Sequence, residues 1–180
     1  MPVWFGRAIV VALVGAIGVV GSGGILAAPE AASGVRASGG ARIDSEECRL
    51  LNDINRFRRT HDLKPLDLGR DLNEAADHHS QDMARRDYFD HDLGGGTSWS
   101  DNIRDFGYKG NPIGENILAG TSGAGKAFKE WEKSRGHREN MLRGSFESIG
   151  IGRAFEKKSE YGWYWTTTFG GRVENKVNCG

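Results

Sequence analysis

The chain has 180 residues, of which 38% are hydrophobic, so it can form one domain with a sizeable core. Its 24 basic residues balance its 24 acidic residues, and no block of like charge stands out along the chain. The sequence therefore has no electrostatic footprint for nucleic-acid binding, and it gives no sign of an acidic tail.

The N-terminus carries the clearest organisational signal. A stretch without polar side chains, AIVVALVGAIGVV, follows Arg7, and small residues come after it, as in a secretory signal peptide. The segment from Ala8 to Ala28 is also long enough to cross a bilayer as an uncleaved anchor. We therefore predict a signal peptide or membrane anchor over 1–28, a flexible linker over 29–43 and one domain over 44–180. Either alternative makes the protein secreted, or anchored to the outer face of the cytoplasmic membrane.

The two cysteines agree with export. Cys48 and Cys179 lie near the two ends of the predicted domain. Two lone cysteines in an exported protein most simply form one disulfide, whereas two free thiols are less typical outside the cell. Such a bond would tie the C-terminal tail to the first helix and would stabilise the fold by at most roughly 4–5 kcal/mol.

Helical periodicity dominates the first part of the predicted domain. Ser45, followed by two glutamates, predicts a helix start, and apolar residues then recur at helical spacing from Leu50 to Phe57. A second amphipathic helix is expected over 71–87, a short one over 98–106, and a further one over about 126–133.

The pattern then changes to the period of two that is typical of strands. Ile149–Phe155 and Trp163–Phe169 are expected to pair across a charged turn, and Ile113–Leu118 is a shorter candidate strand. Helices precede most of the strands, and no regular βαβ alternation is present. The sequence therefore predicts an α+β fold with a small antiparallel sheet.

Several familiar catalytic motifs are missing from the sequence. It contains no HExxH metal motif, no GxSxG nucleophile elbow, no phosphate-binding P-loop, and no GxGxxG between a strand and a helix. No serine or cysteine stands out as a nucleophile. An active site would therefore have to be built from histidines and carboxylates.

Three of the five histidines have simple structural interpretations. His61 follows the first helix and is expected at the surface. His78 and His79 are adjacent, so a helix turns them to different faces. His79 falls on the apolar stripe with Met83, which predicts a hydrogen-bonded core histidine rather than a metal ligand.

The other two histidines and one glutamate are candidates for chemistry. His91 and His137 each follow a predicted helix end, in loops where functional groups are often presented. Glu115 interrupts an apolar run and needs either exposure or a partner, because an unpaired buried charge is costly. Together they could form a divalent metal site or an acid–base pair, although spacing alone does not require them to meet.

Five motifs occur in an order that resembles a known family. They are YFDHD, GENILAG, W-x-x-S-x-x-H-x-x-N-x-L from Trp131 to Leu142, IGIG and YWTTTFGG. The succession is similar to the CAP superfamily of cysteine-rich secretory, antigen 5 and pathogenesis-related 1 proteins, in its small bacterial extracellular form. The resemblance runs from about Cys48 to Gly171. It implies a three-layer α-β-α sandwich with an open cleft that carries two histidines and two glutamates, and some members hold zinc or another divalent cation there.

Carried over by motif, the resemblance assigns a role to each cleft position. It makes His91 and His137 the cleft histidines, Glu115 the first glutamate, and Asn140 a bracing residue. The family's second glutamate falls on Ser134 in this chain, which is a departure from the pattern. A second departure is Thr167, where family members often carry glutamine.

Three functional hypotheses follow. The leading one is a non-enzymatic extracellular module whose cleft binds a lipid, a cell-wall component or a protein, with or without a divalent cation such as Zn²⁺ on His91 and His137. The second is a metal-dependent hydrolase, in particular a peptidase, that uses these histidines and Glu115. The third is a structural domain in which the cleft residues only satisfy one another. Ser134 argues against the hydrolase, because no second carboxylate shares the work.

Overall fold

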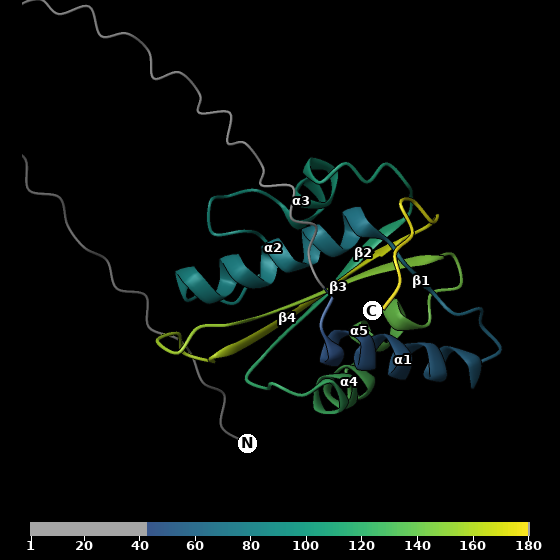
Figure 1. Cartoon of the computed structure of the whole chain (residues 1–180), viewed down its shortest axis with the longest axis horizontal. Helices are drawn as coiled ribbons and strands as arrows, with labels where there is room; N and C mark the ends of the chain where they lie inside the picture. Colours follow the sequence, from purple (N-terminus) through teal and green to yellow (C-terminus); the bar gives the residue numbers. More distant parts are fainter. Residues whose placement is uncertain (1–42, 180) are drawn as a thin grey trace, which may run out of the picture. The chain divides into compact units, whose positions relative to one another are not determined.

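The structure is a computed structural model that describes residues 43–179 (Figure 1). The predicted signal peptide or anchor over 1–28, and all but the last residue of the linker over 29–43, lie outside the described residues. The elements of the described part are α1 (Ser45–Arg59), β1 (Asp67–Leu68), α2 (Arg70–Arg86), α3 (Trp99–Asp105), β2 (Ile113–Ala119), α4 (Ala124–Lys133), α5 (Arg135–Met141), β3 (Ser148–Phe155) and β4 (Trp163–Gly170). Across residues 43–179, no helix combines the length and apolar character that a bilayer crossing requires.

A four-stranded sheet forms the middle of three layers, in the order β1-β3-β4-β2. Helices α2 and α3 lie on one face of the sheet, and α1, α4 and α5 lie on the other (Figure 1). Strand β4 pairs antiparallel with both β2 and β3, as the sequence predicted. The predicted α+β fold with an α-β-α sandwich is therefore confirmed.

One strand was not predicted. Asp67–Leu68 pairs parallel with Ser148–Ile149 at the edge of the sheet, so the complete sheet is mixed. Two residues are too short to show a period, which is why periodicity could not reveal this strand.

Helix α1 begins at Ser45, as the sequence predicted. Its N-cap is Asp44, whose carboxylate accepts hydrogen bonds from the backbone N–H groups of Glu46 and Glu47. The Glu47 carboxylate in turn accepts from the Asp44 N–H at 2.7 Å. This reciprocal capping box satisfies N–H groups that the first turn of a helix leaves unpaired.

Two glycines let α2 lie directly on the sheet. A Cβ atom at Gly150 would come within 2.1 Å of the Leu72 backbone, and one at Gly152 within 2.3 Å of the Asp77 nitrogen. The IGIG motif thus alternates isoleucines, which fill the core on the α1 side, with glycines that leave no side chain on the α2 side. Side chains larger than hydrogen would push the helix away.

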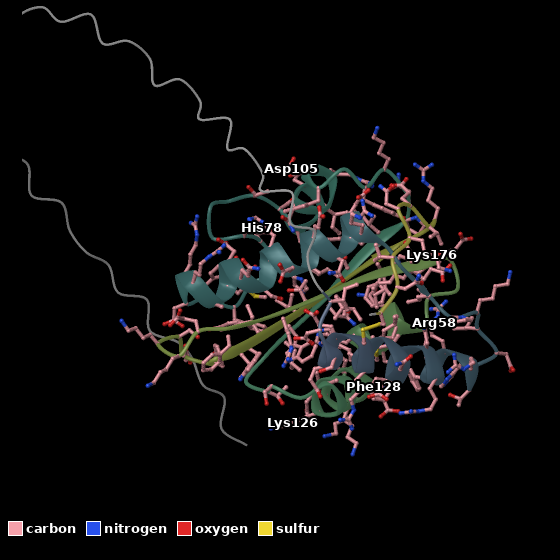
Figure 2. The ribbon with its side chains drawn as sticks, in the orientation of Figure 1. Arg58, His78, Asp105, Lys126, Phe128 and Lys176 are labelled. Atoms are coloured by element: carbon pink, nitrogen blue, oxygen red, sulfur yellow. A yellow bond between two sulfur atoms is a disulfide. The ribbon has the colours of Figure 1, made fainter. Side chains whose placement is uncertain are left out.

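The predicted disulfide between Cys48 and Cys179 is present, with the two Cα atoms 5.6 Å apart (Figure 2). It joins the first turns of α1 to the C-terminal tail, as the sequence predicted.

Arg58, near the end of α1 (Figure 2), fixes the segment that follows α5. Its side chain is only 1% exposed, and its guanidinium donates to the backbone carbonyls of Lys64, Met141, Arg143 and Phe146. Burial lowers the pKa of Arg58, yet a guanidinium stays charged at any physiological pH. The charge is therefore held by carbonyl dipoles, which lock α1 to the residues beside the cleft.

Candidate functional site

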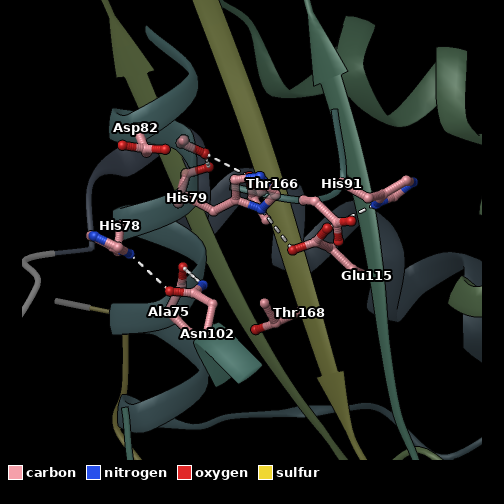
Figure 3. Close-up of polar contacts among 12 residues, drawn as sticks. Ala75, His78, His79, Asp82, His91, Asn102, Glu115, Thr166 and Thr168 are labelled. Atoms are coloured by element: carbon pink, nitrogen blue, oxygen red, sulfur yellow. Dashed lines mark hydrogen bonds and ion pairs between the residues drawn. The ribbon is translucent and has the colours of Figure 1, made fainter. Parts of the chain in front are cut away.

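Glu115 is the centre of the candidate site. It lies on the edge strand β2, and its side chain is 1% exposed. One carboxylate oxygen is 2.9 Å from His79 Nδ1, and the other is 2.8 Å from His91 Nδ1 (Figure 3). Burial is tolerated because both oxygens have hydrogen-bonding partners.

His79 is fully buried on α2 and is hydrogen-bonded, as its position on the apolar stripe predicted. The sequence did not reveal that its partner is the cleft glutamate. Its second nitrogen, Nε2, lies 3.1 Å from the Asp90 carbonyl, which can only accept, so this nitrogen carries a hydrogen. His79 therefore links α2 to Glu115 and to the loop that presents His91. A buried histidine and a buried glutamate each need a partner, and that shared need was the signal available in the sequence.

His91 lies in the loop after α2, and its side chain is 48% exposed. The hydrogen bond to Glu115 raises the pKa of His91, against the opposing effect of partial burial. Because Nδ1 is engaged with Glu115, the opposite ring nitrogen, Nε2, is the one that faces other groups.

His137 lies in a short helix rather than in the loop that the sequence predicted. Helix α4 ends at Lys133, and α5 begins at Arg135, so the motif W-x-x-S-x-x-H spans the junction of two helices. Burial lowers the pKa of His137, and the charge of nearby His91 lowers it further. Both effects favour a neutral imidazole. Its ring and the Trp131 indole pack in an edge-to-face arrangement, with ring centroids 6.3 Å apart.

Asn140 connects α5 to the edge strand. Its Nδ2 group donates to the Glu115 carbonyl at 3.0 Å and to Asn116 Oδ1 at 2.9 Å. Asn116 in turn donates to the His137 carbonyl at 3.1 Å. This chain of bonds holds the helix that bears His137 against the strand that bears Glu115, which is the bracing role assigned to Asn140 by motif.

Ser134 caps the end of α4 and the start of α5 at once, and its side chain makes no capping hydrogen bond. Glu130, one turn earlier, pairs with Lys133 at the surface at 3.2 Å and does not replace the missing glutamate. Thr167 is fully buried on β4 opposite Asn116, and its hydroxyl has no hydrogen-bonding partner among the described residues. Both departures from the family pattern thus lie on the α5 side of the sheet, away from the pair of histidines on Glu115.

A cavity of about 410 Å³ opens beside His91 and Glu115. Apolar surface comes from Trp99 and Ile113, and a cationic group comes from Arg143. The full lining is Asp90, His91, Asp92, Trp99, Ile113, Gly114, Glu115, Asn140 and Arg143. Neither Ser134 nor His137 belongs to this lining. The cavity therefore offers an apolar wall, three carboxylates (Asp90, Asp92 and Glu115) and the positive group of Arg143 to one ligand.

The residues fit a divalent cation only as an open site. His91 has the arrangement that metal-binding histidines usually show, with one ring nitrogen held by a carboxylate and the other available. His137 would be the second ligand. Within residues 43–179, however, no group of three or more histidines, cysteines or carboxylates is placed to hold an ion. Two imidazoles are fewer than the three protein ligands that catalytic zinc sites typically have.

Comparison with known proteins agrees with the fold and with the order of the motifs. Residues 51–169 match the model of the cysteine-rich secretory protein (CAP) family. The chain is 34% identical to the uncharacterized Bacillus subtilis protein YkwD over 130 residues, and 29% identical to the uncharacterized membrane protein YlbC of the same bacterium over 108 residues. These matches cover 72% and 60% of this chain, but only 49% and 31% of the two relatives. The chain thus spans half or less of the length of these curated relatives.

Two solved structures share the fold. One is an extracellular protein containing a SCP domain from Bacillus anthracis, with a TM-score of 0.61 and 29% identity, over 68% of this chain and 39% of that one. The other is an outer surface protein from Borrelia burgdorferi, with a TM-score of 0.64 and 21% identity, over 74% of this chain and 98% of that one.

Proposed function

Because the chain belongs to the cysteine-rich secretory protein (CAP) family, we propose that it acts outside the cytoplasm as a ligand-binding module rather than as an enzyme. The location is supported by the signal-like N-terminal sequence, by the disulfide, and by the descriptions of the Bacillus anthracis and Borrelia burgdorferi proteins as extracellular and outer surface proteins. The family does not itself imply catalysis, because one fold can carry many functions.

The observation that carries this proposal is the state of the Glu115 carboxylate. Both of its oxygens are taken by imidazole nitrogens, at 2.8 and 2.9 Å. These two bonds use one lone pair on each oxygen and fix the carboxylate, whose side chain is 1% exposed, between the histidines. The geometry therefore supports a carboxylate that holds two histidines in position.

The hydrolase alternative is further weakened by Ser134. With no glutamate at this position, Glu115 would have to orient a metal ligand and also accept a proton. Its hydrogen bonds to His79 and His91 show it in the first of these tasks, and no second carboxylate stands at Ser134 for the other.

The lining of the cavity supports a ligand that combines a polar group, able to accept a hydrogen bond from Arg143, with an apolar neighbour. Arg143 would bind the first, and Trp99 together with Ile113 would contact the second. A lipid, a cell-wall fragment and a protein segment each offer such a combination, and they are the three partner classes we propose for the cleft.

Binding in the cleft can be tested through Trp99, which lines it. The fluorescence of Trp99 is obtained as the difference between the wild type and Trp99→Phe. We expect one of three probes, a phospholipid, a soluble muropeptide or a short peptide, to change this fluorescence. Arg143→Ala is expected to weaken that binding by about tenfold, since a charge-assisted hydrogen bond contributes about 1.5–3 kcal/mol. Arg135→Ala, on an exposed part of α5, is the matched control and should bind like the wild type. Peptide hydrolysis by the wild type that disappears in folded Glu115→Gln would instead support an enzyme.

A divalent cation is a second part of the proposal. His91 and His137 would hold it, and the ion would supply a positive centre for an anionic group of the ligand. We expect Zn²⁺ titrated into the chain to bind with an affinity that falls by more than about tenfold in the double variant His91→Ala with His137→Ala. His61→Ala, an exposed histidine at the end of α1, is the control. Equal Zn²⁺ binding by the wild type and both variants would show that His91 and His137 do not hold the ion.

A further inference from the structure

Large apolar side chains are exposed mainly at one end of the described domain. Phe155 is 55% exposed, Phe89 45% and Tyr161 43%. Val173, at 37%, is the other exposed large hydrophobic residue within residues 43–179. Together with the half-buried Trp163, the first three form what we call the aromatic tip (Phe89, Phe155, Tyr161 and Trp163). From this feature we propose that the aromatic tip docks the domain onto a neutral lipid surface.

The rings of the aromatic tip cover both faces of the β3–β4 hairpin. Phe155 lies opposite Trp163 in the strand register, with ring centroids 5.0 Å apart. On the α2 side, Tyr161 packs against Phe89 at 6.0 Å, although these residues are far apart in the sequence. Figure 1 shows the turn between β3 and β4 at the left end of the sheet, below the C-terminal end of α2 and beyond α4. The exposed rings therefore lie together at the hairpin, where a surface can contact them.

The turn is fixed before any partner arrives. The Asp87 carboxylate, just after α2, accepts from the Glu160 backbone N–H at 2.6 Å and from the Tyr164 hydroxyl at 3.4 Å. Gly162 has a φ of +71°, and a Cβ there would lie 3.4 Å from the Phe155 ring. Docking would therefore cause little loss of backbone conformational entropy.

The charges beside the rings indicate the kind of surface. Glu156 and Glu160 cancel Lys157 and Lys158, so the turn has no net charge to attract a strongly acidic or basic partner. Tryptophan, tyrosine and lysine are the residues that favour membrane–water interfaces, where rings enter the headgroup region and ammonium groups stay in water. This combination suits a zwitterionic lipid surface better than a charged macromolecule.

The start of the described chain is linked through Arg153 to one ring of the aromatic tip, Trp163. Arg153 stacks over Trp163 and Trp165, at 4.7 and 5.5 Å from their centroids, and donates to the Asp44 carboxylate at 2.6 Å. The apolar stretch from Ala8 to Ala28 precedes this point in the sequence. If that stretch is held in a bilayer, the chain itself brings the domain to a lipid surface, which makes lipid the occupant we propose.

The experiment uses the full chain with vesicles of phosphatidylcholine whose acyl chains carry bromine, which quenches tryptophan on contact. The Trp163 emission is obtained as the difference between the wild type and Trp163→Phe, so that the other tryptophans cancel. We expect brominated lipid to remove most of this emission, and added salt to leave the loss unchanged because no net charge is involved. The double variant Phe155→Ser with Tyr161→Ser should lose the quenching. Val173→Ser, which removes an exposed apolar residue outside the tip, should keep it.

Iodide, which quenches tryptophan side chains that are exposed to water, supplies the measurement that can contradict the proposal. Trp163 emission that iodide quenches and brominated lipid does not would place the tip in water and overturn the proposal. Emission that neither agent quenches would overturn it too, because something else would then cover the rings, such as a second copy of the chain, which light scattering would reveal. Lipid quenching that survives in Phe155→Ser with Tyr161→Ser would equally exclude the tip as the docking surface.

Discussion

At the scale of single residues, Glu47 is a carboxyl buried at the open edge of β3. It is 4% exposed, and its two oxygens accept from the backbone N–H groups of Asp44 and Arg153. Removal from water raises the pKa of Glu47 from 4.5 to about 7, although these two hydrogen bonds act in the opposite direction. The side chain thus closes part of an unpaired strand edge at an electrostatic cost.

That cost should appear as a pH dependence of stability. Because the folded-state pKa lies above the unfolded value, the folded protein binds the proton more tightly. Protonation of Glu47 therefore adds up to about 3 kcal/mol to the free energy of unfolding. This stabilisation is fully present below pH 4.5 and is lost as the pH rises to about 7. We expect Glu47→Gln, which keeps a capping side chain, to flatten the decline in unfolding free energy measured by urea denaturation between pH 5 and 8.

A surface glutamate supplies the control for this series. Glu130→Gln, in an exposed ion pair on α4, should leave the pH profile unchanged. A decline that is as steep in Glu47→Gln as in the wild type would show that other groups cause it.

At the scale of elements, the contact between α2 and β3 depends on the two glycines of the IGIG motif. Gly150→Ala would place a Cβ 2.1–2.3 Å from backbone atoms of Leu72 and Asn73, which a rotamer change cannot relieve. We expect a loss of more than about 3 kcal/mol of unfolding free energy, measured by thermal or urea denaturation. Gly95→Ala is the matched control, because nothing lies within 4 Å of its Cβ and it should unfold like the wild type. Similar stabilities for the two variants would contradict this packing.

The helices and strands differ in how well the sequence could predict them. The long helices and strands were predictable because their apolar periods are local properties. Helix α5 was not, because it has only seven residues and contains Gly136, a poor helix former, and it is held by contacts with other elements, such as the bond from Asn140 to β2. The hydrogen bond between His79 and Glu115 joins residues 36 positions apart, so it follows from the layering of α2 on the sheet and not from any local motif.

At the scale of the whole molecule, the Cys48–Cys179 bond closes a loop that contains nearly all of the domain. The double variant Cys48→Ser with Cys179→Ser is expected to lose about 2–4 kcal/mol of stability, because a long loop is then free in the unfolded chain. Its melting temperature should fall to that of the reduced wild type. Zn²⁺ and probe binding at the cleft should stay unchanged, since α1 and the C-terminal tail do not line the cavity. A loss of cleft binding in this folded variant would show that the bond also shapes the site.

The same bond has a consequence for survival among proteases. The loop around Gly94, Gly95 and Gly96 is exposed, and exposed loops are where proteolytic nicks concentrate. A nick there, or at any one point between Cys48 and Cys179, leaves two pieces that are still joined covalently. The severed halves could not diffuse apart, so the sheet and both helical layers could close again around the cut. If the domain meets extracellular proteases, the disulfide would let it keep its fold after a single cleavage.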